Sequence, residues 1–150
     1  MSIISLASSA SVWRGYEYYK NGYVLLCNKV SEHEFRAKVR GSGRNYDVFI
    51  DIDHPRKSKC NCPHADGTKR ICKHMVALYF KMFPGEAADY IREVEEREME
   101  EEERQQELED KLVNYINSLS KEELKDALYD VLCDSPEWVL ERFIYERVEW

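Results

Sequence analysis

The spacing of hydrophobic and polar positions changes along this 150-residue chain, and each change indicates a different kind of element. Between residues 9 and 21 the side chains of Trp13 and Tyr16 recur at helical spacing, and Gly22 follows as a helix stop. The pattern therefore predicts a short helix. We interpret its aromatic residues as core residues rather than as stacking platforms for bases, because exposed aromatic residues are the less common state.

Three extended stretches follow this helix. Residues 23–30 are mostly apolar, and in residues 35–40 and 46–53 apolar positions alternate with polar ones. A period of two is typical of strands with one buried and one solvated face. The connections at residues 31–33 and 41–43 have the length of hairpin turns. The stretches therefore predict an antiparallel β-meander.

A nearly continuous apolar run from Met75 to Phe83 predicts a helix that is buried on more than one side, and Pro84 and Gly85 stop it. The composition then changes sharply. Residues 86–110 are rich in Glu, Arg and Gln, and too few apolar positions remain for a coiled-coil seam. This segment can form a solvated acidic helix or stay partly disordered, and we favour the helix because most of these residues are good helix formers.

Apolar positions return at helical spacing towards the C-terminus. Ser120 starts a capping box, and Ser135 followed by Pro136 predicts the start of a further helix. This pattern predicts a helical hairpin or a three-helix cluster, in which we expect Trp138 and Trp150 to pack against neighbouring helices.

Residues of types that bind metals are concentrated in residues 60–74. Cys60 and Cys62 are separated by one residue, as are Cys72 and His74, and turn-forming residues lie between the two pairs. Side chains at i and i+2 of an extended segment leave from the same face, so each pair can act as a two-pronged clamp. Three thiolates and one imidazole close a tetrahedral zinc site without an open position. The spacing predicts one structural Zn²⁺.

His64 is the one alternative ligand in this stretch, but it follows Pro63 inside the turn and breaks the paired spacing, which favours His74. The two other cysteines, Cys27 and Cys133, lie in apolar contexts and are interpreted as core residues. Lysines and arginines surround the four ligands. We expect their charge to lower the pKa of the thiols and to favour the thiolates that bind metal.

The cysteine and histidine pattern resembles the SWIM-type zinc finger, in which a Cys-x-Cys pair, a variable gap and a Cys-x-His pair follow one another. The similarity includes Pro63 after the second cysteine and the Cys-Lys-His triplet at residues 72–74 before an apolar helix. Residues 14–22 and 39–42 resemble segments that precede the finger in small prokaryotic SWIM proteins. The resemblance covers residues 1–85 well, and it implies zinc binding and recognition of nucleic acid or protein.

Together these elements predict an α+β fold, in which a small antiparallel β-meander with a ββα-like zinc finger is followed by an all-helical acidic C-terminal segment. The predicted divisions are a SWIM-type zinc-binding domain at residues 1–85, an acidic helical linker at residues 86–110 and a helical hairpin at residues 111–150. Because the core of such a domain is small, the metal should matter to its stability.

The net charge of −7 conceals a strong difference between the two parts of the chain. Residues 1–85 hold 14 Lys and Arg against 7 Asp and Glu, a balance of +7, whereas residues 86–150 hold 8 against 22, a balance of −14. Such asymmetry suggests a nucleic-acid face in the first part and an acidic arm in the second. The candidates for phosphate contacts are Arg36, Lys38, Arg40, Arg44, Arg56, Lys57, Lys59, Lys69, Arg70 and Lys73.

The sequence contains no arrangement typical of a catalytic site, such as a glycine-rich phosphate loop or a His-Glu-x-x-His motif. Asp47, Asp51 and Asp53 alternate on a predicted strand and could bind a divalent ion in a nuclease. We favour the simpler interpretation that they form the solvated face of that strand. We therefore expect neither an enzyme nor a small-molecule substrate.

These observations predict a zinc-binding module that contacts nucleic acid, with DNA favoured over RNA. The alternative is a protein–protein interaction adaptor that uses the finger and the acidic helical tail, where the tail engages a basic partner or masks the basic half. No apolar run is long enough to cross a membrane, and the first 12 residues lack the basic region of a signal peptide. With cysteine usage that fits a reducing compartment, we expect a cytoplasmic protein without a membrane partner.

Overall fold

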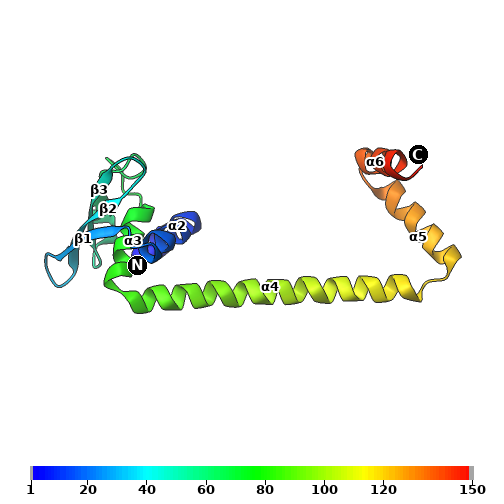
Figure 1. The fold of residues 1–150 in the computed structure, drawn as a ribbon, viewed down its shortest axis with the longest axis horizontal. Coiled ribbons are helices and arrows are strands. Elements are labelled where there is room, and N and C mark those ends of the chain that lie inside the picture. Colours follow the sequence, from blue (N-terminus) through cyan, green and yellow to red (C-terminus); the bar gives the residue numbers. More distant parts are fainter. Residues whose placement is uncertain (1, 149–150) are drawn as a thin grey trace. The chain divides into compact units, whose positions relative to one another are not determined.

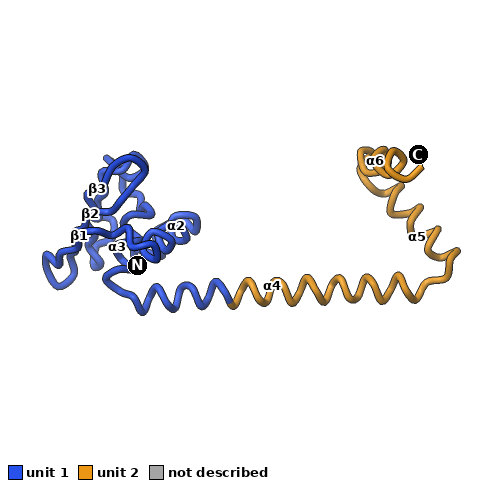
Figure 2. Tube along the Cα trace, viewed as in Figure 1, with its two compact units in different colours: residues 1–95 blue, residues 96–150 orange. Residues whose placement is uncertain are grey.

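The computed structural model describes residues 2–148 and divides the chain into two compact units, Met1–Glu95 and Glu96–Trp150 (Figure 2). The first unit contains a four-stranded sheet and the helices packed on it, and the second is entirely helical in its described part. The predicted α+β fold is confirmed.

The sheet of the first unit is an antiparallel meander with the strand order β1-β2-β3-β4. Along β2, Phe35, Ala37 and Val39 are buried while the basic residues between them are exposed, as the alternation predicts. A short fourth strand extends the three predicted ones and carries the first cysteine of the finger. The strands are β1 (Val24–Lys29), β2 (Glu34–Arg40), β3 (Asn45–Asp51) and β4 (Lys59–Cys60).

The predicted buried helix is α3 (Lys73–Met82), which packs against one face of the sheet (Figure 1). Most of its residues from Met75 to Phe80 are almost inaccessible to solvent, so α3 is the centre of the core. The predicted N-terminal helix is α2 (Ser9–Lys20), and it ends as expected before Gly22, whose φ is +68°. The sequence patterns did not predict the short helices α1 (Ile3–Leu6) and η1 (Pro55–Lys57).

The helices α2 and α3 meet at Gly15. A Cβ atom at this position would lie 2.5 Å from the Cβ of Val76 and 2.9 Å from the carbonyl oxygen of Lys73, so no side chain fits there. Beside this contact Tyr16 packs edge-on against Phe80, with 6.1 Å between the ring centroids. Packing of the aromatic residues is therefore confirmed for Tyr16, whereas Trp13 is 41% exposed.

Asp51, at the end of β3, does not follow the prediction that the aspartates of this strand form a solvated face. This residue is only 6% exposed. Its carboxylate accepts a hydrogen bond from the backbone N–H of His54 (2.7 Å), and its own N–H donates to the hydroxyl of Ser58 (3.1 Å). The interpretation of Asp51 as a solvated residue is wrong, because it fixes the turn that leads from β3 to β4.

The residues Pro84 and Gly85 end α3 as predicted, but they also begin α4 (Pro84–Ser118), so that Phe83 is the only residue between the two helices. Proline is well suited to this first helical position, where its missing N–H needs no partner. Ala87 is buried against the core of the first unit, which is why this unit continues beyond residue 85 to Glu95. The predicted acidic helix is confirmed.

The second unit contains the rest of α4, then α5 (Lys121–Asp134) and α6 (Glu137–Arg147). The capping box of Ser120 and Glu123 at the start of α5 is confirmed. The predicted cap of α6 is wrong in detail, because the hydroxyl of Ser135 donates to the carbonyl of Val131 and so closes α5. Pro136 is the N-cap residue of α6.

No side chain of residues 96–148 is buried. Trp138 is 62% exposed and Cys133 is exposed, so their interpretation as packed residues is wrong, while Trp150 lies outside the described residues. The interpretation of Cys27 holds better, since its half-buried thiol donates to the sulfur of Met82 (3.1 Å) at the edge of the core. None of the described helices has the length and apolar character that a membrane-spanning helix needs.

We predict that Gly15→Ala destabilises the first unit by about 1–3 kcal/mol, the usual cost of adding a methyl group where no space exists. The matched control is Gly85→Ala, because a Cβ atom there meets no atom within 4 Å, and its effect should stay within about 1 kcal/mol. Chemical denaturation of the two zinc-loaded variants measures both values. Equal stability of the two variants would contradict the close contact of α2 with α3.

Candidate metal centre

The first pair of cysteines is fixed to the sheet. Cys60 lies at the end of β4 opposite Val48 of β3. The next residue, Asn61, accepts a hydrogen bond from the N–H of Asp47 (2.9 Å) and donates its own N–H to the carbonyl of Asp47 (3.3 Å). Because Asn61 points to solvent, Cys60 and Cys62 on either side of it are buried, as the extended spacing predicts.

The second pair lies where the chain enters α3. The preceding residue, Ile71, is buried and forms a parallel bridge with Ala7. Cys72 is the N-cap residue, with φ −99° and ψ 167°, and His74 is the second residue of the helix. Of this pair only Cys72 has an extended backbone, so the prediction that both residues of the pair lie on an extended segment is wrong. The start of the helix instead places the imidazole of His74 beside the thiol of Cys72.

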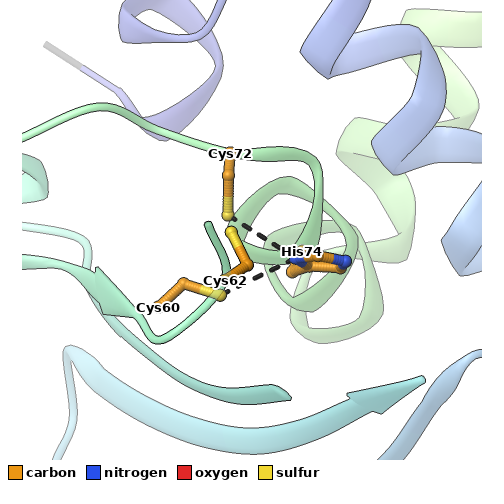
Figure 3. Close-up of side chains that lie close together, drawn as sticks. All are labelled: Cys60, Cys62, Cys72 and His74. Carbon is orange, nitrogen blue, oxygen red and sulfur yellow. Dashed lines mark hydrogen bonds between the residues drawn. The ribbon is translucent and has the colours of Figure 1, made fainter. Parts of the chain in front are cut away.

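The four ligand atoms lie within 4.8 Å of one another, and all four side chains are buried. Figure 3 shows the three sulfur atoms and Nδ1 of His74 turned towards one another. Nδ1 lies 3.7 Å from Sγ of Cys60 and 3.9 Å from Sγ of Cys72. A tetrahedral zinc ion with ordinary bond lengths holds a sulfur and a nitrogen ligand about 3.6 Å apart. The residues present therefore fit zinc.

Backbone N–H groups near the thiols favour the charged form of the sulfur and so act to lower the thiol pKa. They belong to Cys62 near Cys60, to His64 near Cys62 and to Met75 near Cys72. Backbone donors of this kind stabilise negative charge on sulfur without adding a positive ion, and they orient the ligands for the metal. The loop thus supplies three thiolate sites and the donors that support them.

The imidazole of His74 is held by two tyrosine rings. The ring of Tyr46 lies 4.7 Å from it and the ring of Tyr18 meets it edge-on at 5.4 Å. With Nδ1 directed at the sulfurs, Nε2 is the nitrogen that carries the proton in the metal-bound form. Nε2 is buried and has no hydrogen-bond partner in the described part of the chain.

The thiols influence one another more than the surrounding cations influence them. Hydrogen bonds from Cys60 and then from His74 lower the pKa of Cys72 to about 4, whereas the hydrogen bond to Cys72 and burial raise the pKa of Cys60. Burial and the neighbouring Cys72 raise the pKa of Cys62. The expectation that lysines and arginines lower all three values is wrong. A divalent cation is what makes three adjacent thiolates favourable.

The alternative ligand His64 lies on the exposed part of the loop and does not belong to the four-residue cluster. The chain turns back between the two pairs through hydrogen bonds from the N–H groups of Ala65 and Asp66 to the carbonyl of Cys62. Gly67 completes this turn with φ +67°. The cluster of Cys60, Cys62, Cys72 and His74 is positioned to bind one zinc ion.

The ten basic residues predicted to contact phosphate occupy several elements. On β2, Lys38 forms an ion pair with Asp47 (3.3 Å), while Arg36 lies over the ring of Phe49 at 5.5 Å. In the same way Arg40 covers Tyr23, and Arg44 covers Tyr46. The others are Arg56 and Lys57 on η1, Lys59 on β4, Lys69 and Arg70 on the finger loop, and Lys73 on α3.

Sequence reasoning did not identify Tyr18 and Tyr46 as neighbours of the metal centre. Both lie far from residues 60–74 in the sequence, and only the meeting of α2 and β3 with α3 brings their rings to His74. The tyrosine-rich stretch of residues 14–22 was noted for its family resemblance, and its structural role is to supply Tyr18 and Gly15.

The comparisons with known proteins agree with this geometry. A family model described as the SWIM zinc finger matches residues 46–82, which run from the tyrosine above His74 to the end of α3. The upstream stretch of residues 14–22 lies outside the matched part. The comparisons with curated proteins and with solved structures gave no significant match.

We predict that the chain binds one zinc ion and that His74→Ala lowers its zinc affinity by more than about 100-fold, the upper range of changes next to a ligand. The matched control is His64→Ala, which should leave zinc affinity unchanged because His64 is exposed. Competition with a chromophoric chelator measures both. If His64→Ala released the metal while His74→Ala kept it, the assignment of the fourth ligand would be wrong.

Proposed function

Because this chain contains a SWIM zinc finger with a closed Cys₃His site, we propose that it is a nucleic-acid-binding module whose finger and neighbouring strands contact phosphates. DNA is the favoured ligand. The zinc has a structural role in this proposal, since four protein ligands already fill a tetrahedral set. The proposal therefore assigns the chain no catalysis.

The observation that carries the proposal is the group of free cations around the finger. Five basic side chains between residues 54 and 73 are exposed, and none of them forms an ion pair within the described residues. The same stretch holds one acidic residue, Asp66. Unpaired cations on a metal-fixed loop are suited to phosphate contacts, which provide most of the non-specific affinity for nucleic acid. These residues, the finger cations, are Arg56, Lys57, Lys59, Lys69 and Arg70.

The exposed face of the sheet adds a second group. The guanidinium carbons of Arg36 and Arg40 on β2 lie 5.5 and 5.6 Å from the ring centroids of Phe49 and Tyr23. A cation–π contact of this kind holds a guanidinium near the ring while its N–H groups can still bind phosphate oxygens. Lys38 between them is neutralised by Asp47, so we expect Arg36 and Arg40 to contribute more than Lys38.

We predict that Lys69→Ala combined with Arg70→Ala weakens binding to all nucleic-acid sequences alike, because phosphate contacts carry no sequence information. The slope of log affinity against log salt should become shallower by roughly 0.9 for each lost contact on duplex DNA. Fluorescence anisotropy with single- and double-stranded DNA and RNA, at several salt concentrations, measures both effects on the zinc-loaded full-length chain.

The control for this variant is Lys121→Ala combined with Lys125→Ala, which removes the same charge from α5 in the second unit. This control should retain the wild-type affinity. Loss of affinity for one sequence alone would contradict the phosphate-contact model, and absence of binding by the zinc-loaded wild type at low salt would overturn the proposed function. A fragment ending at Glu95, which keeps Ala87 in the core, tests masking, since removal of an acidic mask would raise the affinity.

A second candidate function is protein–protein interaction through the second unit, and the exposed apolar side chains of this unit favour it. Helices as short as α5 and α6 are marginal in water unless an apolar face is buried, and exposed apolar patches commonly mark interaction sites. The large exposed apolar residues from the end of α4 onwards are Leu108, Leu112, Val113, Tyr115, Ile116, Leu124, Leu128, Tyr129, Val131, Trp138, Leu140, Ile144, Tyr145 and Val148. Since the unit is acidic, we propose a partner with basic residues around an apolar surface.

We predict that Leu128→Glu combined with Val131→Glu abolishes this interaction, because both residues lie on one exposed face of α5. The matched control is Glu122→Gln on the same helix. Capture of proteins by the full-length chain, with mass spectrometry of the bound fraction, compares the three forms, and zinc content should be the same in all of them. Identical captured proteins for both variants and the wild type would argue against the adaptor function.

A further inference from the structure

A cavity of about 250 Å³ lies beside the metal centre. Its walls come from α2, from the turn between β2 and β3, from the finger loop and from the first turn of α3. Cys62, Cys72 and His74 contribute to the walls but Cys60 does not. The cavity therefore adjoins the metal centre on the side away from Cys60.

The walls of this cavity are rich in hydrogen-bond donors. None of the described residues that line it is a carboxylate, and the charge of the two lining thiolates, Cys62 and Cys72, would be largely offset by the zinc ion that they bind. By contrast, the larger cavity between β3 and the finger loop includes both Asp47 and Asp66. The side chains that can donate to an anion in the smaller cavity are Ser11, Arg14, Ser42, Tyr46, His64 and Lys73.

Among these donors Arg14 is the cation best placed to bind an anion. Its side chain is exposed, and no ion pair links it to a carboxylate in residues 2–148. Lys73 is less available, because its ammonium group donates to the hydroxyl of Tyr18 at 2.7 Å. A guanidinium also matches the oxygen atoms of a phosphate in pairs, which a lysine does not.

The start of α3 adds further donors to the same wall. Cys72 at the N-cap makes no side-chain cap hydrogen bond, and the first N–H groups of a helix have no acceptor within it. Such a helix start favours negative charge. His74 also lines the cavity, through a ring that is only 3% exposed. Its Nε2 has no partner in the described structure.

From this arrangement we propose that the cavity binds a phosphate group of the nucleic acid and that Arg14 holds it. The inference rests on the proposed function and names the part of the ligand that this site takes. It adds a residue outside the finger itself, since Arg14 comes from α2 and lies beside Gly15, where α2 touches α3. The phosphate is either a terminal one or one within the backbone, and both present the same tetrahedral anion.

The test compares the zinc-loaded full-length wild type with Arg14→Gln and with Lys20→Gln, a matched control that removes an exposed cation from the same helix. Binding of 5′-phosphorylated and 5′-hydroxyl oligonucleotides is measured by fluorescence anisotropy, and inorganic phosphate is titrated while thermal unfolding is followed. Arg14→Gln should weaken oligonucleotide binding about tenfold and remove the stabilisation by inorganic phosphate. Lys20→Gln should do neither, and Arg14→Lys should restore only part of the affinity.

The oligonucleotides distinguish the two sources of phosphate. A preference for the 5′-phosphorylated form that disappears in Arg14→Gln identifies a terminal phosphate, whereas an equal loss for both forms identifies a backbone phosphate. If the wild type binds oligonucleotides and Arg14→Gln binds them as well as Lys20→Gln does, the phosphate site is wrong while the proposed function stands. If no oligonucleotide binds but inorganic phosphate stabilises the wild type and not Arg14→Gln, the site stands and the proposed function fails. No effect of either ligand overturns both.

Discussion

The interaction on which the first unit depends is the coordination of zinc by residues from two different elements. Cys60 and Cys62 belong to the end of the sheet, while Cys72 and His74 belong to the start of α3. Because α1, α2 and the first turns of α4 all pack around α3, the metal fixes the helix that organises the core to the sheet that it covers. In a unit with so small a core, the free energy of zinc binding is a large part of the free energy of folding.

Two tyrosine rings and two basic side chains lead from the metal ligand His74 towards the protein surface. Its imidazole lies between the rings of Tyr18 and Tyr46, Lys73 contacts Tyr18, and Arg44 covers Tyr46. Each of these two cations therefore contacts a tyrosine ring that packs against the metal ligand His74. Gly41 makes room for this arrangement, since a side chain there would overlap the ring of Tyr46. A structural zinc ion can in this way determine where neighbouring charged side chains are placed.

The sequence was most informative where local chemistry determines structure. The period of two around Phe35, the capping box at Ser120 and the choice of the four zinc ligands all depend on neighbours in the chain. All three predictions are confirmed, although the second pair of ligands is not extended as predicted. Features that depend on tertiary contacts were missed. Asp51 is buried in the turn that leads from β3 to β4, where it bonds to His54 and Ser58, and the tyrosines around His74 come from distant elements. Helical periodicity also predicted packing for Trp138, but periodicity identifies an apolar face without showing what covers it.

The spacing of the ligands also has a consequence for the order of folding. All four lie within residues 60–74, whereas the bridge between Ala7 and Ile71 and the contact of Gly15 with Val76 each close a loop of about sixty residues. Closing the longer loops costs roughly 1 kcal/mol more in chain entropy, and contacts that are local in sequence form faster. Chain entropy therefore favours an order in which the metal centre forms first and the N-terminal helices dock afterwards on the finger.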